Sequence, residues 1–258
     1  MKKTSMQGVF FAFLLSFFFI GMRPVCYGQN QQLVEMVEIL QSMTPISMGM
    51  MGEVTDITIS RGELVLTASV DESMVNIKKL QENPELLKEN MNQMILNKSS
   101  NIHFLIDELK DSGLGLRLKY IRKTSGETVS CSLTSEEVKN ADYEDNDPDK
   151  FLEVQIRVTN AQLPMDYGNG MVNTKVVREG NYVVYYFVCE EPTYDIDLMQ
   201  RNIPLMRDMI LEQVNSSDAA LSMFRQVCKN AGCGISYYYV GKTSGKIAKL
   251  IIPVNELK

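Results

Sequence analysis

The sequence contains little histidine and no excess of basic residues. One histidine accompanies 26 Lys and Arg against 32 Asp and Glu, and the formal net charge is -6 at pH 7. A single imidazole excludes histidine-rich metal sites and any mechanism that needs two imidazoles. A nucleic-acid-binding protein normally presents a basic face, and this balance of charge argues against one. The composition therefore excludes several functions without identifying one.

The apolar run near the start of the chain is too short to cross a membrane comfortably. Val9 to Ile20 falls short of the roughly 20 apolar residues that a transmembrane helix needs. It follows Lys2 and Lys3 and is followed by small residues ahead of Gln29, which is the pattern of a secretory signal peptide. We therefore expect residues 1–28 to be a signal peptide. The protein would then be exported to a periplasm, a cell surface or the extracellular space.

Two alternatives would leave the protein attached to a membrane. The apolar segment could be retained as an anchor, or Cys26 could carry a lipid at the start of the mature chain. The residues at 23–25 differ from the small-residue sequence that precedes a lipidated cysteine. Removal of residues 1–28 takes away three basic residues and no acid, which leaves the mature chain with a net charge of -9.

Cysteine is scarce in the mature chain. Cys131, Cys189, Cys228 and Cys233 remain, and an even number permits two disulfides in an exported protein. Cys228 and Cys233 are the pair that we expect to bond, because a helix end, a glycine and a strand start would bring them close. The alternative is four buried free thiols.

The mature sequence repeats itself. Lys-Thr-Ser-Gly at 123–126 recurs at 242–245, which is an offset of 119, and prolines and glycines match in order along nearly the whole mature chain. This predicts a tandem duplication of a unit of about 110 residues, a normal size for a domain. We expect a first repeat at 29–139, an acidic linker at 140–150 and a second repeat at 151–258. A calcium loop in the acidic segment is disfavoured, since it lacks the EF-hand glycine and distal glutamate.

Each copy has the same pattern of predicted elements. Alternating apolar residues predict a strand at 152–158, whereas the matching 33–39 alternates less clearly and could be helical. Arg61-Gly62 and Glu179-Gly180 predict tight hairpins. The strands that they join are expected at 54–60, 63–70, 172–178 and 181–188.

Two helices and a second hairpin complete each predicted copy. Asn83 and Asn202 begin the first helix, and Gly113 and Gly232 end the second. The Lys-Thr-Ser-Gly segment then forms the tip of a closing hairpin. The predicted fold is α+β, a tandem duplication of a β-β-β-α-α-β-β unit with two helices packed on one face of a mostly antiparallel sheet.

Possible chemical motifs have simpler structural explanations. Gly241-Lys242-Thr243 lacks the upstream glycine of a phosphate loop and lies in a strand-to-strand turn. His103 has no nucleophile at a recognisable spacing. The methionines at 48–51 offer soft ligands for Cu(I), although core packing explains them as well. We expect no metal site, no cofactor and no nucleic-acid partner.

The two copies differ on the sheet face that is predicted to point away from the helices. Thr67 and Lys119 of the first copy match Tyr185 and Tyr238 of the second, and eight of the ten mature tyrosines lie in the second copy. Adjacent aromatic and aliphatic side chains on a sheet surface usually mark an interaction site. The predicted binding residues are Tyr185, Phe187, Tyr238, Ile247 and Ile251.

Several functions fit such a face. Three alternatives exist for this face. The first is packing against the first copy or the linker, the second is a homodimer, and the third is binding of another protein, a glycan or a lipid. The sequence favours an exported, non-catalytic binding or scaffold protein with a protein partner or a second copy on this face. The alternatives are a periplasmic hydrolase-like enzyme that uses carboxylates, of which only Glu72 and Glu190 match between the copies, and a structural homodimer.

Overall fold

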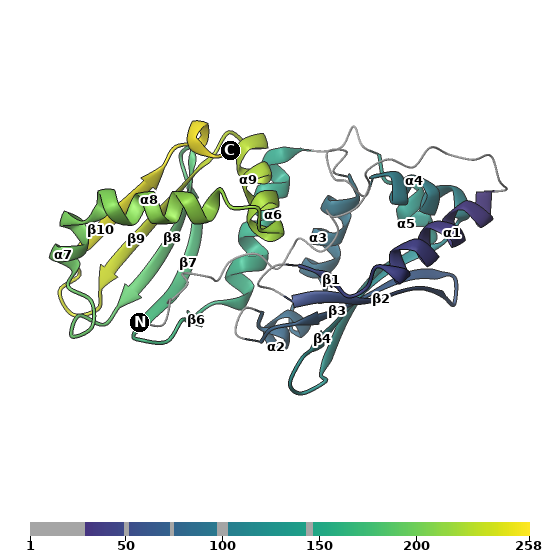
Figure 1. Cartoon of the computed structure of the whole chain (residues 1–258), viewed down its shortest axis with the longest axis horizontal. Coiled ribbons are helices and arrows are strands. Elements are labelled where there is room, and N and C mark those ends of the chain that lie inside the picture. Colours follow the sequence, from purple (N-terminus) through teal and green to yellow (C-terminus); the bar gives the residue numbers. More distant parts are fainter. Residues whose placement is uncertain (1–28, 49–51, 73–74, 97–102, 143–146) are drawn as a thin grey trace. The chain divides into compact units, whose positions relative to one another are not determined.

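The chain has an α+β fold with a duplicated unit. The computed structural model describes residues 29–48, 52–72, 75–96, 103–142 and 147–258. These residues divide into two compact units between Asp147 and Pro148, and each unit contains helices and one five-stranded sheet (Figure 1).

The first unit begins with a helix and contains a mixed sheet. Its helices are α1 (Gln29–Ser42), α2 (Ile77–Gln81), α3 (Pro84–Leu96), α4 (His103–Ser112) and α5 (Ser135–Lys139). Its strands are β1 (Ile46–Ser47), β2 (Gly52–Ser60), β3 (Glu63–Val70), β4 (Gly115–Arg122) and β5 (Thr128–Leu133).

The second unit repeats this order of elements. Its helices are α6 (Pro148–Gln162), α7 (Ile196–Arg201), α8 (Ile203–Val214) and α9 (Ala219–Asn230), followed near the C-terminus by the 3₁₀ turn η3 (Val254–Glu256). Its strands are β6 (Met165–Asp166), β7 (Met171–Glu179), β8 (Tyr182–Cys189), β9 (Gly234–Gly241) and β10 (Ile247–Ile252).

Both sheets have the same topology. The strands are ordered β1-β2-β3-β4-β5 in the first sheet and β6-β7-β8-β9-β10 in the second. All neighbouring strands are antiparallel except the β3–β4 pair and the β8–β9 pair, which are parallel. A parallel pair needs a crossover, and the helices between its two strands supply it. The predicted hairpins at Arg61-Gly62 and in the Lys-Thr-Ser-Gly segments are confirmed.

The first element of each unit corrects the predicted order, because it is a helix in both. The predicted strand at 152–158 is wrong, since these residues belong to α6. Its alternating apolar residues were misleading because Gln155, Thr159 and Gln162 are buried too, so most of the helix surface lies in the core. A helix buried on most sides cannot be distinguished from a strand by alternation alone. Helix α6 also begins at Pro148, so the last residues of the expected acidic linker are helical.

The C-terminal end of α9 explains why two cysteines lie close together. The Cys233 N–H donates to the Cys228 carbonyl at 2.8 Å, and the Gly232 N–H donates to the Lys229 carbonyl at 3.0 Å. These are the two bonds of a Schellman motif, in which the residues corresponding to Cys228 and Cys233 pack together. The predicted disulfide is nevertheless absent: all four described cysteines are free and buried.

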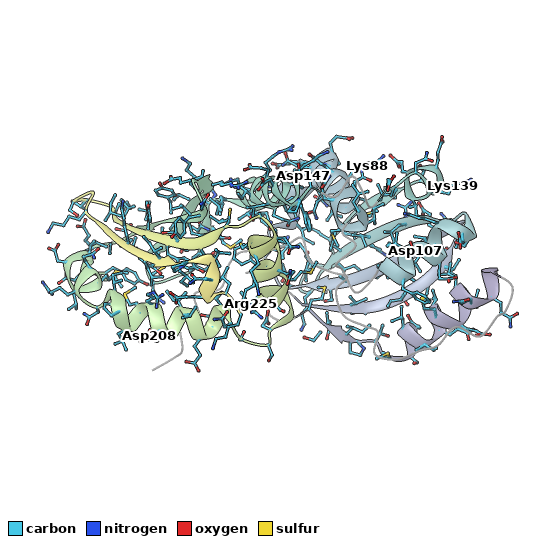
Figure 2. All side chains as sticks on the ribbon, turned by 90° about the horizontal axis from the view of Figure 1, so that it is seen from above. Lys88, Asp107, Lys139, Asp147, Asp208 and Arg225 are labelled. Carbon is cyan, nitrogen blue, oxygen red and sulfur yellow. The ribbon has the colours of Figure 1, made fainter. Side chains whose placement is uncertain are left out.

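A buried arginine joins the end of the second unit to its helices. The Arg225 guanidinium, labelled in Figure 2, donates to the carbonyls of Val214, Ser216 and Lys258. Burial lowers the pKa of Arg225, and the negative charge of Asp218 acts in the opposite direction. These bonds connect Lys258 and the end of α8 to Arg225 in the middle of α9.

Candidate binding surface

Tyr185 and Phe187 are buried, so the prediction that they lie on an exposed sheet face is wrong. Their exposed fractions are 1% and 2%. The Tyr185 ring packs edge-on against Phe224 of α9, with ring centroids 6.3 Å apart. Both residues therefore belong to the core between the sheet and the helices.

A shift of one residue in the comparison of the copies explains this error. The turn between β2 and β3 consists of Arg61 and Gly62, whereas the turn between β7 and β8 consists of Gly180 and Asn181. Glycine occupies the second turn position in one unit and the first in the other, so a match between the glycines gives an offset of 118. The strands themselves match at 119. Since side chains alternate across a strand, a shift of one residue moves each side chain to the opposite face.

The open face of the second sheet contains a continuous row of four side chains. Lys175 of β7 pairs with Tyr186 of β8, Tyr186 pairs with Tyr238 of β9, and Tyr238 pairs with Lys249 of β10. The predicted residue Tyr238 lies in this row, whereas Tyr186, Lys175 and Lys249 were not predicted as binding residues. We call these four residues the Lys-Tyr-Tyr-Lys row.

Each neighbouring pair in the row is in contact. The Tyr186 and Tyr238 rings meet edge to face, with centroids 5.1 Å apart. The Lys249 ammonium lies 4.5 Å from the centroid of Tyr238, and the Lys175 ammonium lies 5.6 Å from that of Tyr186. Cation–π contacts at these distances hold the two charges beside the rings. Within the described part of the chain, neither ammonium has an ion pair with a carboxylate.

One carboxylate orients the row without neutralising its lysines. The Tyr186 hydroxyl donates a hydrogen bond to Glu179, 2.5 Å away. This bond raises the pKa of Tyr186 to about 12, because loss of the proton would place two negative charges together. The hydroxyl is thus a fixed donor at neutral pH, and the ring that carries it has a defined orientation.

Two exposed isoleucines flank the end of the row on β10. Ile247 and Ile251 have exposed fractions of 44% and 43%, and they lie on either side of Lys249 on the same strand face. The sequence therefore placed both residues on the correct face. Tyr186 and Tyr238 are half-buried, so each offers part of its ring to solvent.

The first unit has different chemistry at the equivalent positions. There the row is Asp56, Thr67, Lys119 and Ser130, with the same pairing between strands. No aromatic side chain occurs in this row, and its charges have opposite signs. The comparison shows that the backbone is shared and that the side chains alone make the second row aromatic and cationic.

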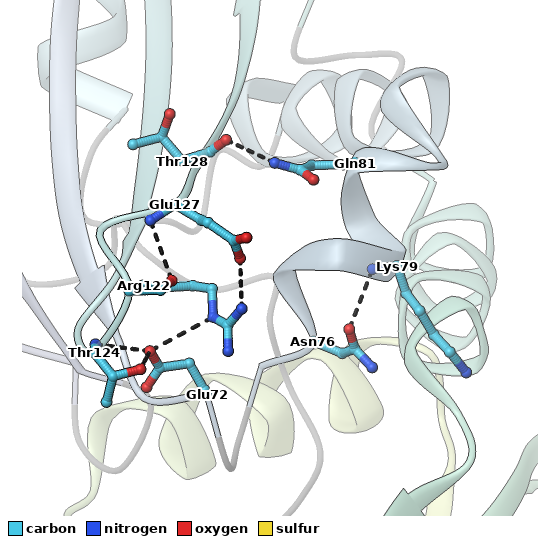
Figure 3. Close-up of polar contacts among 9 residues, drawn as sticks. Glu72, Asn76, Lys79, Gln81, Arg122, Thr124, Glu127 and Thr128 are labelled. Carbon is cyan, nitrogen blue, oxygen red and sulfur yellow. Dashed lines mark hydrogen bonds and ion pairs between the residues drawn. The ribbon is translucent and has the colours of Figure 1, made fainter.

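The acid that recurs in both copies holds a turn. Glu72 accepts hydrogen bonds from the Thr124 N–H at 2.8 Å and from the Thr124 hydroxyl, as Figure 3 shows. These bonds, helped by Arg122, lower the pKa of Glu72 to about 2. In the second unit Glu191 accepts from the Thr243 and Ser244 N–H groups, so Glu191 is the equivalent of Glu72, and the predicted match to Glu190 is wrong.

The other sequence candidates contribute little to a site. Met48 is buried, and residues 49–51 of the methionine cluster lie outside the described residues. His103 begins α4, and its side chain also lies outside them. Among the described residues, no group of three or more His, Cys, Asp or Glu side chains is arranged to hold a metal ion.

Comparisons with known proteins identify little. No family model matches the sequence, and no curated protein matches it. Among solved structures, a predicted secreted protein from Pseudomonas aeruginosa is similar over 46% of this chain and 100% of that chain, with 16% identity and a TM-score of 0.37. None of the helices in the described ranges has the length and apolar character needed to span a membrane.

Proposed function

We propose that the protein is an exported, non-catalytic binding protein that recognises an acidic protein partner through the open sheet face of its second unit. The Lys-Tyr-Tyr-Lys row is the observation that carries this proposal. Tyrosine is common in protein interfaces because it buries a large ring and retains a hydroxyl for polar contact. The flanking Ile247 and Ile251 add exposed apolar area beside it.

Charge supports an acidic partner. Residues 148–258 contain 12 basic and 12 acidic residues, whereas residues 29–147 contain 11 and 20. The second unit therefore has no net charge, whereas the first is acidic. Lys175 and Lys249 thus belong to the unit that has no excess of acidic residues. An acidic partner would pair with Lys175 and Lys249, which increases the association rate and makes binding sensitive to salt.

Export rests on the N-terminal pattern of residues 1–28. The lysines, the apolar run and the small residues before Gln29 are those of a signal peptide. The partner would then be met in an exported compartment or on a cell surface. Fractionation of the producing cells, with N-terminal sequencing of the mature protein, tests this part; an uncleaved cytoplasmic protein would contradict it.

Site-specific photocrosslinking in the producing cells tests the surface. A photoreactive amino acid at Ile247 is expected to give an adduct with a protein of net negative charge, identified by mass spectrometry. The matched control is Thr128, the equivalent exposed position on β5 of the first unit. The adduct should be lost in the double variant Tyr186→Thr, Tyr238→Lys, which carries the first unit's residues, and should weaken with added salt.

The remaining outcomes count against the proposal. Equal crosslinking from Thr128 would mean that the second face is not selective. An adduct with a second copy of the chain would instead indicate a homodimer, and an adduct that survives the double variant would show that the row does not recognise the partner.

A further inference from the structure

Five positions in the interior of the second unit carry polar or polarisable groups where the first unit is entirely apolar. The second unit has Tyr167, Asn173, Tyr185, Cys228 and Tyr237. The residues 119 positions earlier are Met48, Val54, Leu66, Leu109 and Leu118, and all five are buried in the first core. Apolar side chains would suffice for packing, as the first unit demonstrates. We call the five residues of the second unit the interior polar cluster.

Several contacts bring these side chains together. The Tyr185 and Tyr237 rings are stacked with centroids 5.4 Å apart, and the Tyr167 ring lies 5.9 Å from Phe187, which pairs with Asn173 across β7 and β8. Burial raises the pKa of Tyr185, and the nearby Cys228, Tyr237 and Tyr167 raise it further. The polar ends of four residues are therefore near one another.

Asn173 is the member that packing explains least. It has no exposed surface, and neither its oxygen nor its nitrogen completes a hydrogen bond in the structure. The Asn173 amide lies close enough to the Tyr167 hydroxyl to lower the pKa of that group, although burial has the larger effect and raises it. A buried amide whose hydrogen bonds are incomplete destabilises a fold, and valine fills the same position in the first unit.

The cluster is uncharged, and two of its members reach the surface. Asn173, Tyr185 and Cys228 are fully buried, whereas Tyr167 and Tyr237 are each partly exposed. None of the five side chains carries a charge at neutral pH, so an ion would lose its hydration without gaining a partner. Flat rings beside an amide that can donate and accept hydrogen bonds are suited to an uncharged molecule that has both a ring and hydrogen-bonding groups.

We propose that the interior polar cluster binds a small, uncharged, ring-containing molecule that enters beside Tyr167 and Tyr237, stacks on the tyrosine rings and hydrogen-bonds to the Asn173 amide. This site is separate from the open sheet face, on the opposite side of the same sheet. Small-molecule sites commonly combine apolar and aromatic walls with a few polar groups that fix orientation.

The test uses the full chain and a defined set of probes. Benzamide, phenol and 2-pyridone are soaked into crystals at millimolar concentration, and benzoate serves as the charged control. At least one neutral probe is expected within hydrogen-bond distance of Asn173, with no benzoate there. The bound probe should raise the melting temperature of the second unit by about 4 °C or more at saturation.

Variants distinguish a binding site from a structural feature. Asn173→Val, the first unit's residue, should abolish the probe-induced shift while raising the melting temperature of the probe-free protein. Tyr185→Phe removes one hydroxyl, keeps the ring and should weaken binding severalfold. Tyr186→Thr, on the open face, should leave probe binding unchanged, so failure of the surface proposal would not affect this result.

Three results would overturn the inference. These are no neutral probe at Asn173 in the crystals, an equal thermal shift in the Asn173→Val variant, or an ordered water molecule that satisfies the amide in the presence of every probe.

Discussion

The same backbone positions hold different chemistry in the two units. On the open sheet face, Asp56 and Thr67 of the first unit correspond to Lys175 and Tyr186 of the second. In the interior, Leu66 corresponds to Tyr185, and both are buried. The duplicated fold therefore tolerates exchange of polarity on both faces of its sheet. The first unit shows what packing alone requires, and the second shows which residues need another explanation.

The largest loss of stability is expected when a charge is placed in the core of the second unit instead of on its open face. Tyr185→Lys would place an ammonium in the core, whereas Tyr186→Lys would place one on the open face. We expect the first variant to unfold the second unit, with a loss of about 4 kcal/mol or more, and the second to change stability by less than about 1 kcal/mol. Urea unfolding followed by near-ultraviolet circular dichroism measures both. Equal losses would mean that the two strand faces are not distinguished.

A second prediction compares Phe187 with Ala68, its equivalent in the first unit. Phe187→Ala should cost about 3–5 kcal/mol although alanine is native at that position in the first unit, because the surrounding rings cannot collapse into the space. The reciprocal Ala68→Phe should overpack the first core and cost about 1–3 kcal/mol. Thermal unfolding of both variants provides the measurement. A small cost for Phe187→Ala would show that the second core repacks freely.

A smaller effect is expected in the pH dependence of stability, because Glu72 and Glu191 each accept hydrogen bonds from a turn. The folded pKa of Glu72 lies below that of an unfolded glutamate, so its stabilising contribution is complete above about pH 4.5 and is lost as the pH falls towards 2. Glu72→Gln should flatten this dependence for the first unit. Carboxyl-carbon NMR titration and Thr124 amide exchange measure it.

Glu191 provides the matched test in the second unit, because its pKa is lowered by the bonds from Ser244 and Thr243. Glu191→Gln should change the turn at 242–245 and leave the turn at 123–126 unaltered. A glutamate that titrates at its ordinary pKa in either unit would show that the turn does not depend on it.

The smallest predicted effect concerns the Arg61-Gly62 turn between β2 and β3, in which glycine occupies the second position instead of the first. Arg61 has a positive φ of 53°, a conformation that costs most L residues roughly 1–2 kcal/mol, whereas Gly180 occupies the equivalent position in the second unit. Arg61→Gly should stabilise the first unit by less than about 1 kcal/mol, since glycine also gains freedom in the unfolded chain. Chemical denaturation is the measurement, and clear destabilisation would indicate that the arginine side chain has a role of its own.

Much of the fold followed from local patterns in the sequence. The duplication, the hairpin strands and the Lys-Thr-Ser-Gly turns depend on glycines and alternating residues whose conformational preferences act over a few positions. The helical character of 152–158 did not follow, because polar as well as apolar residues of α6 are buried and the apolar ones alone alternate as in a strand. The parallel pairing of β3 with β4 also has no local signal, since it joins segments separated by three helices.

The candidate surface was only partly predictable. Tyr238, Ile247 and Ile251 were placed on the open face correctly, because they lie in the hairpin where both copies match at 119. An alignment of the two-residue turns, rather than of their glycines, assigns Tyr186 instead of Tyr185 to the open face.

The sequence by itself determined that there are two copies of one α+β unit and that the second is rich in tyrosine. Only the tertiary structure decided which tyrosines lie in the core and which lie on the surface. The physical reason is the alternation of side chains along a strand: strand register assigns each residue to a face, and that register depends on pairing with strands distant in the chain.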